Sequence, residues 1–100
     1  MKGIKNNMDI KKYREEIDQI DKDIANLFSK RMEVVKQIAI FKNENNLPIF
    51  DENREQEIIN KNLDLVDEDL KENYKKFLIN LMDESKKYQA EVIKNLKNNK

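Results

Sequence analysis

Apolar residues recur at alternating intervals of three and four positions over the first 40 or so residues of the chain. They are Ile10, Tyr13, Ile17, Ile20, Ile24, Leu27, Val34, Ile38 and Phe41. This spacing predicts a helix from about Ile10 to Asn43 that packs along one narrow apolar stripe. Such a helix would be about 50 Å long at 1.5 Å per residue. A chain of 100 residues cannot cover that length by itself, so we expect a partner chain.

Two shorter helices are predicted in the rest of the chain. The segment 45–48 contains the single proline and interrupts the apolar pattern, which indicates a loop. Asp51 is then placed to cap a second helix from about Glu52 to Leu65. Residues 66–70 form an acidic connection, and a third helix is expected from about Leu70 to Leu96. The pattern predicts an all-α fold of three helices with a long first helix.

Composition supports this fold and excludes several classes of function. Charged residues make up 40% of the chain and apolar residues 38%, which suits long helices with a wide solvated face. One glycine and one proline are too few for the turns of a sheet protein. The formal net charge is zero, so no basic surface indicates nucleic-acid binding. The absence of Cys and His excludes a disulfide framework and the usual metal ligands.

The two ends of the sequence show little pattern that predicts structure or targeting. Residues 1–7 are expected to be a flexible N-terminal segment, residues 8–96 one domain, and residues 97–100 a polar tail. The N-terminal lysines are not followed by an apolar run, so no signal peptide is predicted, and no segment is apolar enough to span a membrane. We therefore expect a soluble, cytoplasmic protein.

Arg31 occupies a position where the apolar stripe of the first helix should continue. A cation there is costly unless it is paired or serves a ligand. Lys42 follows eleven residues later, about three helical turns, and points almost the same way from about 16 Å along the axis. Two cations that flank an apolar surface could hold a small dianion. The alternative is that Arg31 forms a buried ion pair or fixes the register of packed helices.

Arg14 cannot reach the same place within one chain. It precedes Arg31 by seventeen residues, which corresponds to about 25 Å along the helix and about a quarter turn around it. If Arg14 serves this site, a second copy of the chain must supply it. Otherwise it is a solvated arginine beside Asp18.

Two further pairs of polar residues could complete a site. Arg54 and Glu55 fall in the first turn of the second helix, where free backbone N–H groups also attract ligands. Ser85 and Gln89 are four residues apart on the third helix, on or near its apolar stripe. The simpler interpretation is first-turn charge for the former pair and a satisfied polar contact between helices for the latter.

Taken together, these segments resemble the all-helical class of chorismate mutases. The resemblance covers about residues 8–96 and is carried by Tyr13 to Asp21, Lys30-Arg31-Met32, Phe41-Lys42, Leu47-Pro48, Asp51 to Glu55 and Ser85 to Gln89. It implies an intertwined homodimer of three-helix chains that converts chorismate to prephenate, in the biosynthesis of phenylalanine and tyrosine, without cofactor or metal. It also implies that the two subunits share the long first helix.

The resemblance assigns a role to each candidate residue. Arg31 would bind a substrate carboxylate, Arg14 would enter the partner's site, and Ser85 would contact a carboxylate. Lys42 and Gln89 would hydrogen-bond the ether oxygen of the breaking bond. Glu55 and the backbone of Asp51 would contact the ring hydroxyl, and Arg54 would support them.

Two other functions fit parts of the sequence. Isochorismate pyruvate-lyases share the fold and the arginine and lysine pattern, although the segments at Asp51, Arg54-Glu55 and Ser85 resemble the mutases more. A non-catalytic helical interaction module, in which charges on the apolar stripe set the register, is the other alternative. It gives no reason for the candidate residues to occur together.

Overall fold

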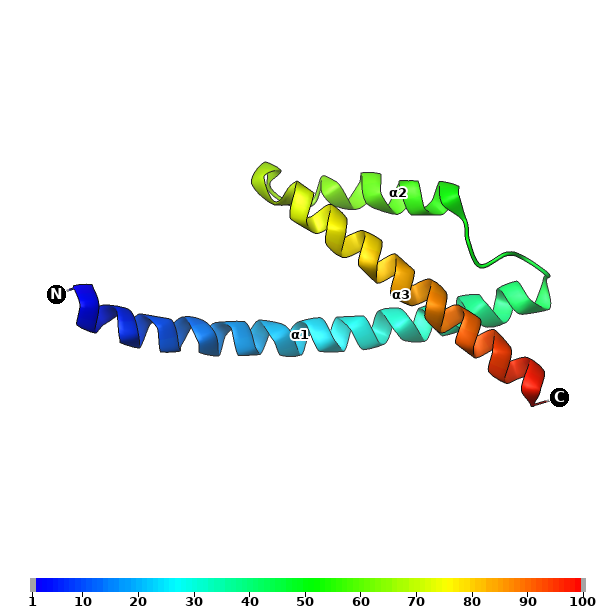
Figure 1. Ribbon diagram of the computed structural model, residues 1–100, viewed down its shortest axis with the longest axis horizontal. Coiled ribbons are helices and arrows are strands. Elements are labelled where there is room, and N and C mark those ends of the chain that lie inside the picture. The colour runs from blue at the N-terminus through cyan, green and yellow to red at the C-terminus, as the bar shows by residue number, and fades with distance from the viewer. Residues whose placement is uncertain (1, 100) are drawn as a thin grey trace. The chain divides into compact units, whose positions relative to one another are not determined.

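The computed structural model describes residues 2–99, with side chains from Asp9 onward, and contains three α-helices and one short 3-10 helix (Figure 1). The helices are α1 (Lys2–Glu44), α2 (Glu52–Leu63) and α3 (Lys71–Asn98), and the 3-10 helix η1 (Glu68–Leu70) precedes α3. The predicted all-α fold with a long first helix is confirmed. The chain divides into a first unit, residues 1–33, and a second unit, residues 34–100. We describe each unit by itself.

The helices begin and end within two residues of the predicted positions, except at the start of α1. Helix α1 begins at Lys2, well before the expected start near Ile10, while its end at Glu44 is one residue from the predicted one. Apolar periodicity marks where a helix packs, and the backbone can remain helical beyond the packed stretch. The expected connection after α2 contains η1. The domain boundaries predicted at residues 8 and 96 remain predictions.

Helix α1 ends in a reversal that the sequence encodes locally. Asn46 has a φ of 55°, in the left-handed region that asparagine tolerates better than most residues. The backbone N–H of Leu47 then donates to the carbonyl of Lys42 at 2.9 Å, the bond that closes a Schellman motif. Pro48 follows and cannot continue the helix. This geometry directs the chain into the loop before α2.

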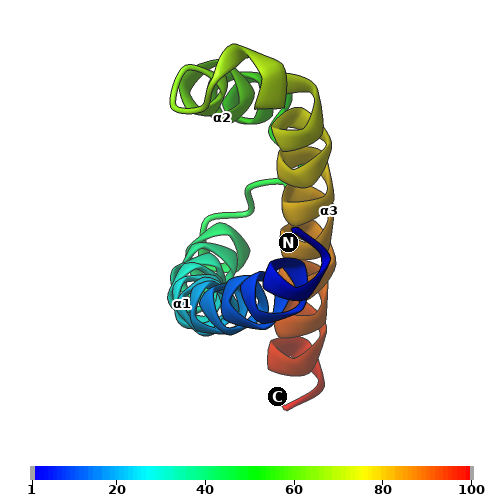
Figure 2. The same ribbon diagram turned by 90° about the vertical axis from the view of Figure 1, so that its left-hand side faces the viewer.

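The core of the second unit lies between α2 and α3, which converge at the turn that contains η1 (Figures 1 and 2). Its buried residues are Ile59, Leu78 and Met82, and Ile58, Leu63 and Tyr74 pack against them. The ring of Tyr74 also stacks on that of Phe77, with centroids 5.7 Å apart. Burying a side chain of this size contributes about 1.5–3 kcal/mol. The core therefore fixes α2 against the first half of α3.

A second group of buried residues lies on the last turns of α1 and the second half of α3. Both views show α3 passing beside the C-terminal part of α1 (Figures 1 and 2). Val35 and the completely buried Ala39 lie on that part of α1. Ser85, Gln89 and Val92 are buried on α3. Two of the three buried residues on this half of α3 are polar, which is unusual for a helix interface.

The first unit differs because its apolar stripe is exposed. Its large apolar residues from Ile10 to Phe28 are each between 45% and 63% exposed. This set consists of Ile10, Tyr13, Ile17, Ile20, Ile24, Leu27 and Phe28. A contiguous exposed stripe of this kind marks an interaction surface. Over the residues that the structure describes, no helix combines the length and apolarity needed to cross a bilayer.

Candidate active site

The predicted site residues are distributed over both units. Arg14 and Arg31 belong to the first unit, where Arg14 is exposed and Arg31 is half-buried. The other six belong to the second unit: Lys42, Asp51, Arg54, Glu55, Ser85 and Gln89. The second unit therefore supplies the geometry discussed below.

Lys42 is half-buried in the last turn of α1 and is held in place by the loop that follows. Its ammonium Nζ donates to the carbonyl oxygen of Ile49 at 2.8 Å. An ammonium has three donors, so this bond leaves two for another acceptor. Lys42 also lines a hollow of about 360 Å³ together with Leu47, Pro48, Phe50, Asp51, Glu52 and Asn53. This volume lies within the range of small-molecule sites.

Asp51 caps α2, as the sequence predicts. Its carboxylate oxygen Oδ1 accepts the backbone N–H of Arg54 at 3.0 Å, and its φ and ψ of −135° and 95° are extended. Glu52 and Glu55 place further negative charge in the first turn, where the helix dipole favours it. Among the described residues of the second unit, 34–99, the backbone N–H of Asp51 itself has no acceptor. The cap therefore orders the start of α2 and leaves one donor available beside the hollow.

The adjacent Arg54 and Glu55 point to different partners. Arg54 forms an ion pair with Glu57 along the exposed face of α2, and such surface pairs contribute little to stability. Glu55 is half-buried, and its Oε2 accepts a hydrogen bond from the ammonium of Lys86 at 3.0 Å. This pair joins α2 to α3 at the residue next to Ser85.

Ser85 and Gln89 lie one turn apart on the buried face of α3. The hydroxyl of Ser85 donates to the carbonyl of Leu81 at 2.8 Å. The side-chain amide of Gln89 is buried, yet its Oε1 has no hydrogen-bond partner in the part of the chain that the structure describes. Buried amides are almost always hydrogen-bonded, and leaving one unpaired costs about 1–3 kcal/mol. Oε1 of Gln89 thus lacks a donor within the described chain.

Lys86 is the residue of this region for which the sequence indicated no role. Besides Glu55, its ammonium contacts Asp83 at 3.3 Å and lies 4.9 Å from the centroid of the Phe50 ring. The hydrogen bond to Glu55, reinforced by Asp83, raises the pKa of Lys86 above its ordinary value of 10.5, against a lowering by desolvation. No local pattern could reveal this pairing, because the two partners lie on different helices.

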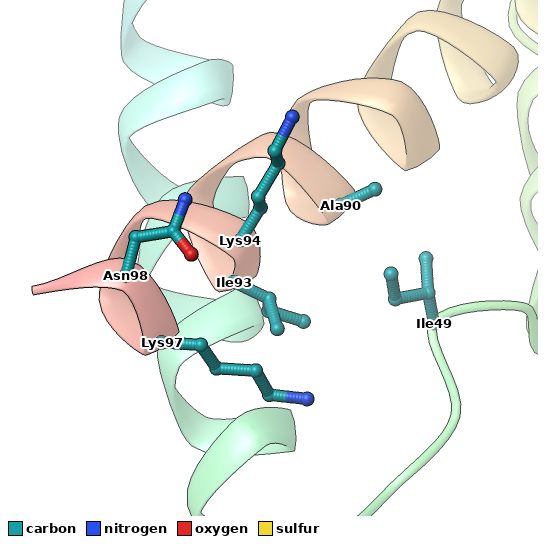
Figure 3. A pocket seen from close by; sticks show the side chains of 6 residues that line it. All are labelled: Ile49, Ala90, Ile93, Lys94, Lys97 and Asn98. Atoms are coloured by element: carbon teal, nitrogen blue, oxygen red, sulfur yellow. The ribbon is translucent and has the colours of Figure 1, made fainter. Parts of the chain in front are cut away.

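A second hollow, of about 390 Å³, lies near the end of α3 (Figure 3). Ile49, Ala90 and Ile93 form its apolar part, and Lys94, Lys97 and Asn98 contribute polar groups. Its three polar side chains are exposed, and none of the predicted site residues lines it. The hollow that Lys42 and Asp51 line is therefore the better candidate for the site. Among the described residues, no group of three or more carboxylates is arranged to hold a metal ion.

Comparison with known protein families identifies the family of the chain. The model of the family "Chorismate mutase type II" matches residues 13–90, more than three quarters of the chain. The chain belongs to the chorismate mutase type II family. The matched segment contains all eight predicted site residues, from Arg14 to Gln89.

Two curated proteins are similar to parts of this chorismate mutase type II chain. A "Bifunctional chorismate mutase/prephenate dehydratase" of Aquifex aeolicus is 42% identical over 57 residues, which are 57% of this chain and 16% of that protein. The "T-protein" of Haemophilus influenzae is 41% identical over 46 residues, 46% of this chain and 12% of that protein. The chain thus spans less than a fifth of either relative. No solved structure matches it significantly.

Proposed function

We propose that this protein rearranges chorismate to prephenate, the step that leads towards phenylalanine and tyrosine. The observation that carries the proposal is that a chain of the chorismate mutase type II family buries the polar side chain of Gln89, whose Oε1 has no partner among the described residues. The amide nitrogen of Gln89 would donate to the ether oxygen of chorismate, whereas Oε1 is an acceptor and would need a separate donor. Lys42, held by Ile49 with two donors left, would bind the same ether oxygen.

The remaining candidates would hold the substrate in a reactive shape. Arg31 and Ser85 would bind carboxylates, and Arg14 of a second subunit would add a further cation. Glu55 and the free backbone N–H of Asp51 would contact the ring hydroxyl, with Arg54 supporting the start of α2. Orienting the flexible enolpyruvyl arm over the ring removes much of the entropic barrier.

The reaction needs no acid, base or nucleophile. In a Claisen rearrangement one C–O bond breaks as a C–C bond forms, and negative charge grows on the ether oxygen. A fixed ammonium and an amide donor that point at this oxygen bind the transition state more tightly than the substrate, which raises kcat. We therefore propose that the protein works without cofactor or metal, and that the reaction is not impaired by the lack of His and Cys in the chain.

We also propose that the active form is an intertwined homodimer. The exposed stripe of the first unit supports this, because a second copy carries a matching stripe. Burial of seven large apolar side chains would give the association its driving force. In such a dimer Arg14 serves the partner's site. The cytoplasmic location expected from the sequence remains a prediction.

Turnover of chorismate tests the proposed activity directly. Purified protein in the presence of a metal chelator should consume chorismate and release prephenate, measured by absorbance and by chromatography of the product. Chorismate that persists at high protein concentration would contradict the proposal. Release of pyruvate from isochorismate, without prephenate formation from chorismate, would assign the protein to the pyruvate-lyases of the same fold.

Mixing two inactive variants tests the shared site. Arg14→Ala and Arg31→Ala should each be inactive, and subunit exchange should produce mixed dimers in which one site of two retains both arginines. Activity should therefore recover to at most about a quarter of the wild-type value, since about half of the dimers are mixed at equilibrium. Mass spectrometry would first establish that the subunits have exchanged. If activity then fails to recover, Arg14 is not supplied by the partner.

A further inference from the structure

Lys86 lies at the centre of a cluster that links α3 to the start of α2. Its ammonium is 3.0 Å from Oε2 of Glu55, 3.3 Å from Oδ1 of Asp83 and 4.9 Å from the centroid of the Phe50 ring. These three groups come from α2, from α3 and from the loop before α2. The lysine therefore contacts neighbours from three directions, which restricts the position of its charge.

The neighbouring Lys87 provides a contrast within the same helix. It pairs with Glu84 at 3.2 Å, but both side chains are largely exposed, at 75% and 61%. The side chains of Lys86 and Glu55 are 29% and 24% exposed. Solvent screens an exposed pair almost completely and a half-buried pair much less. The Lys86 pair consequently constrains Glu55 more strongly than the Lys87 pair constrains Glu84.

The two oxygens of the Glu55 carboxylate have different surroundings. Oε2 accepts from Lys86, whereas Oε1 has no partner among the described residues of the second unit, 34–99. A carboxylate with one oxygen held by a cation cannot rotate freely, so the direction of its second oxygen is fixed as well. An acceptor oriented in this way loses little entropy when a hydroxyl donor binds to it.

We propose that Lys86 is a positioning residue that holds Glu55 so that its free oxygen accepts the ring hydroxyl of the substrate. This inference rests on the proposed mutase activity, and it adds a residue to which the family resemblance gave no role. Lys86 acts through Glu55 and does not touch the substrate. Asp83 and Phe50 serve to hold the lysine itself.

A double-mutant cycle tests whether Lys86 acts through Glu55. Lys86→Met should lower kcat/KM about tenfold, which is in the middle of the range of interaction energies between residues in contact. Lys87→Met should change kcat/KM less than twofold. In a Glu55→Ala background, Lys86→Met should add less than a twofold loss, because no carboxylate is left to position. Losses that multiply in the double variant would overturn the proposal, since they would indicate an independent role for Lys86.

Chemical rescue separates the effect of the charge from that of packing. The chain has no cysteine, so Lys86→Cys introduces a single reactive thiol. Its thiolate displaces bromide from 2-bromoethylamine and forms a thioether that carries an ammonium at the length of lysine. This product should recover kcat/KM to within about threefold of wild type, whereas the neutral product of iodoacetamide should stay about tenfold lower. Equal activities of the two products would contradict the proposal.

The outcomes distinguish this inference from the proposed function. An inactive wild-type protein would disprove the mutase activity, and the role of Lys86 in it would fall too. An active wild type with Lys86→Met as active as Lys87→Met would disprove the role of Lys86 alone. Circular dichroism measured with each assay shows whether a variant has kept its helix content. The two alkylated products come from the same Lys86→Cys protein, so their difference in activity reflects the added group.

Discussion

The two units of this chain differ in how far they bury their apolar surface. The second unit packs α2 on α3 and buries Ile59, Leu78 and Met82 within the single chain. The first unit is one stretch of helix whose apolar stripe remains about half exposed. An isolated helix gains little stability from its own hydrogen bonds, because packing of an apolar face is the main stabilising term. We therefore propose that the first unit, unlike the second, is stabilised by a second copy of the chain.

The same contrast extends to the polar residues. In the second unit, Lys42, Asp51, Glu55 and Ser85 each have a partner of stated geometry within the chain. In the first unit, Arg14 lies exposed among residues whose expected cover is a second copy. We infer that the second unit presents a partly preformed site and that dimerisation completes it.

The largest effect is expected from a charge in the exposed stripe. Ile20→Glu should prevent dimerisation, because an unpaired carboxylate would be buried between the two stripes. Activity should fall by at least about a hundredfold, since Arg14 could no longer reach a partner's site. Analytical ultracentrifugation and chorismate turnover measure the two effects.

Lys22→Glu is the matched control for this substitution. It reverses a charge two residues away, on the opposite side of the helix, and should leave both the dimer and the activity intact. A monomeric but fully active Ile20→Glu protein would show that the second unit forms a complete site alone. That result would remove the distinction drawn between the units.

A smaller loss of activity is expected from a substitution of Gln89. Stability should stay the same or rise while activity falls. Gln89→Met keeps the side-chain volume and removes a buried amide whose Oε1 lacks a partner among the described residues. The melting temperature should stay the same or rise, while kcat/KM should fall by about a hundredfold with the loss of a transition-state donor. A melting temperature several degrees lower would mean that the amide is satisfied in the folded protein, so it would not be reserved for substrate.

The cap of α2 should show a purely local effect on stability. Asp51→Ala removes the acceptor of the Arg54 N–H and should lower the free energy of unfolding by about 1 kcal/mol, measured by urea denaturation. Asp51→Ser supplies another capping oxygen and should restore most of it. An unchanged stability in Asp51→Ala would indicate that the core between α2 and α3 orders this turn without the cap.

The sequence predicted the elements of this fold well, because their signals are local. Alternating apolar spacing, the proline at position 48 and the capping aspartate at position 51 each act within a few residues. The start of α1 was less accurate, since Lys2–Asp9 continues the helix before the apolar stripe begins. The roles of the candidate site residues are still predictions.

The contacts of the site could not be predicted in the same way. The pairing of Glu55 with Lys86 depends on how α2 and α3 meet, and the unpaired Oε1 of Gln89 depends on what covers the buried face of α3. In the sequence, Lys86 and Lys87 are two equivalent lysines, and only packing separates a half-buried positioning group from a solvated one.

The smallest expected effect is the pH dependence of the contact between α2 and α3. Because Glu55 raises the pKa of Lys86 above 10.5, folding favours the charged lysine. The resulting stabilisation is fully present below the unfolded value of 10.5 and is lost as pH rises through the higher folded value. Thermal melts of wild type and Lys86→Met should therefore differ at neutral pH and converge above that range, whereas Lys87→Met should melt like wild type throughout. A difference that persists in strong alkali would arise from packing of the lysine stem on Phe50, and α2 would then be held to α3 by apolar contact alone.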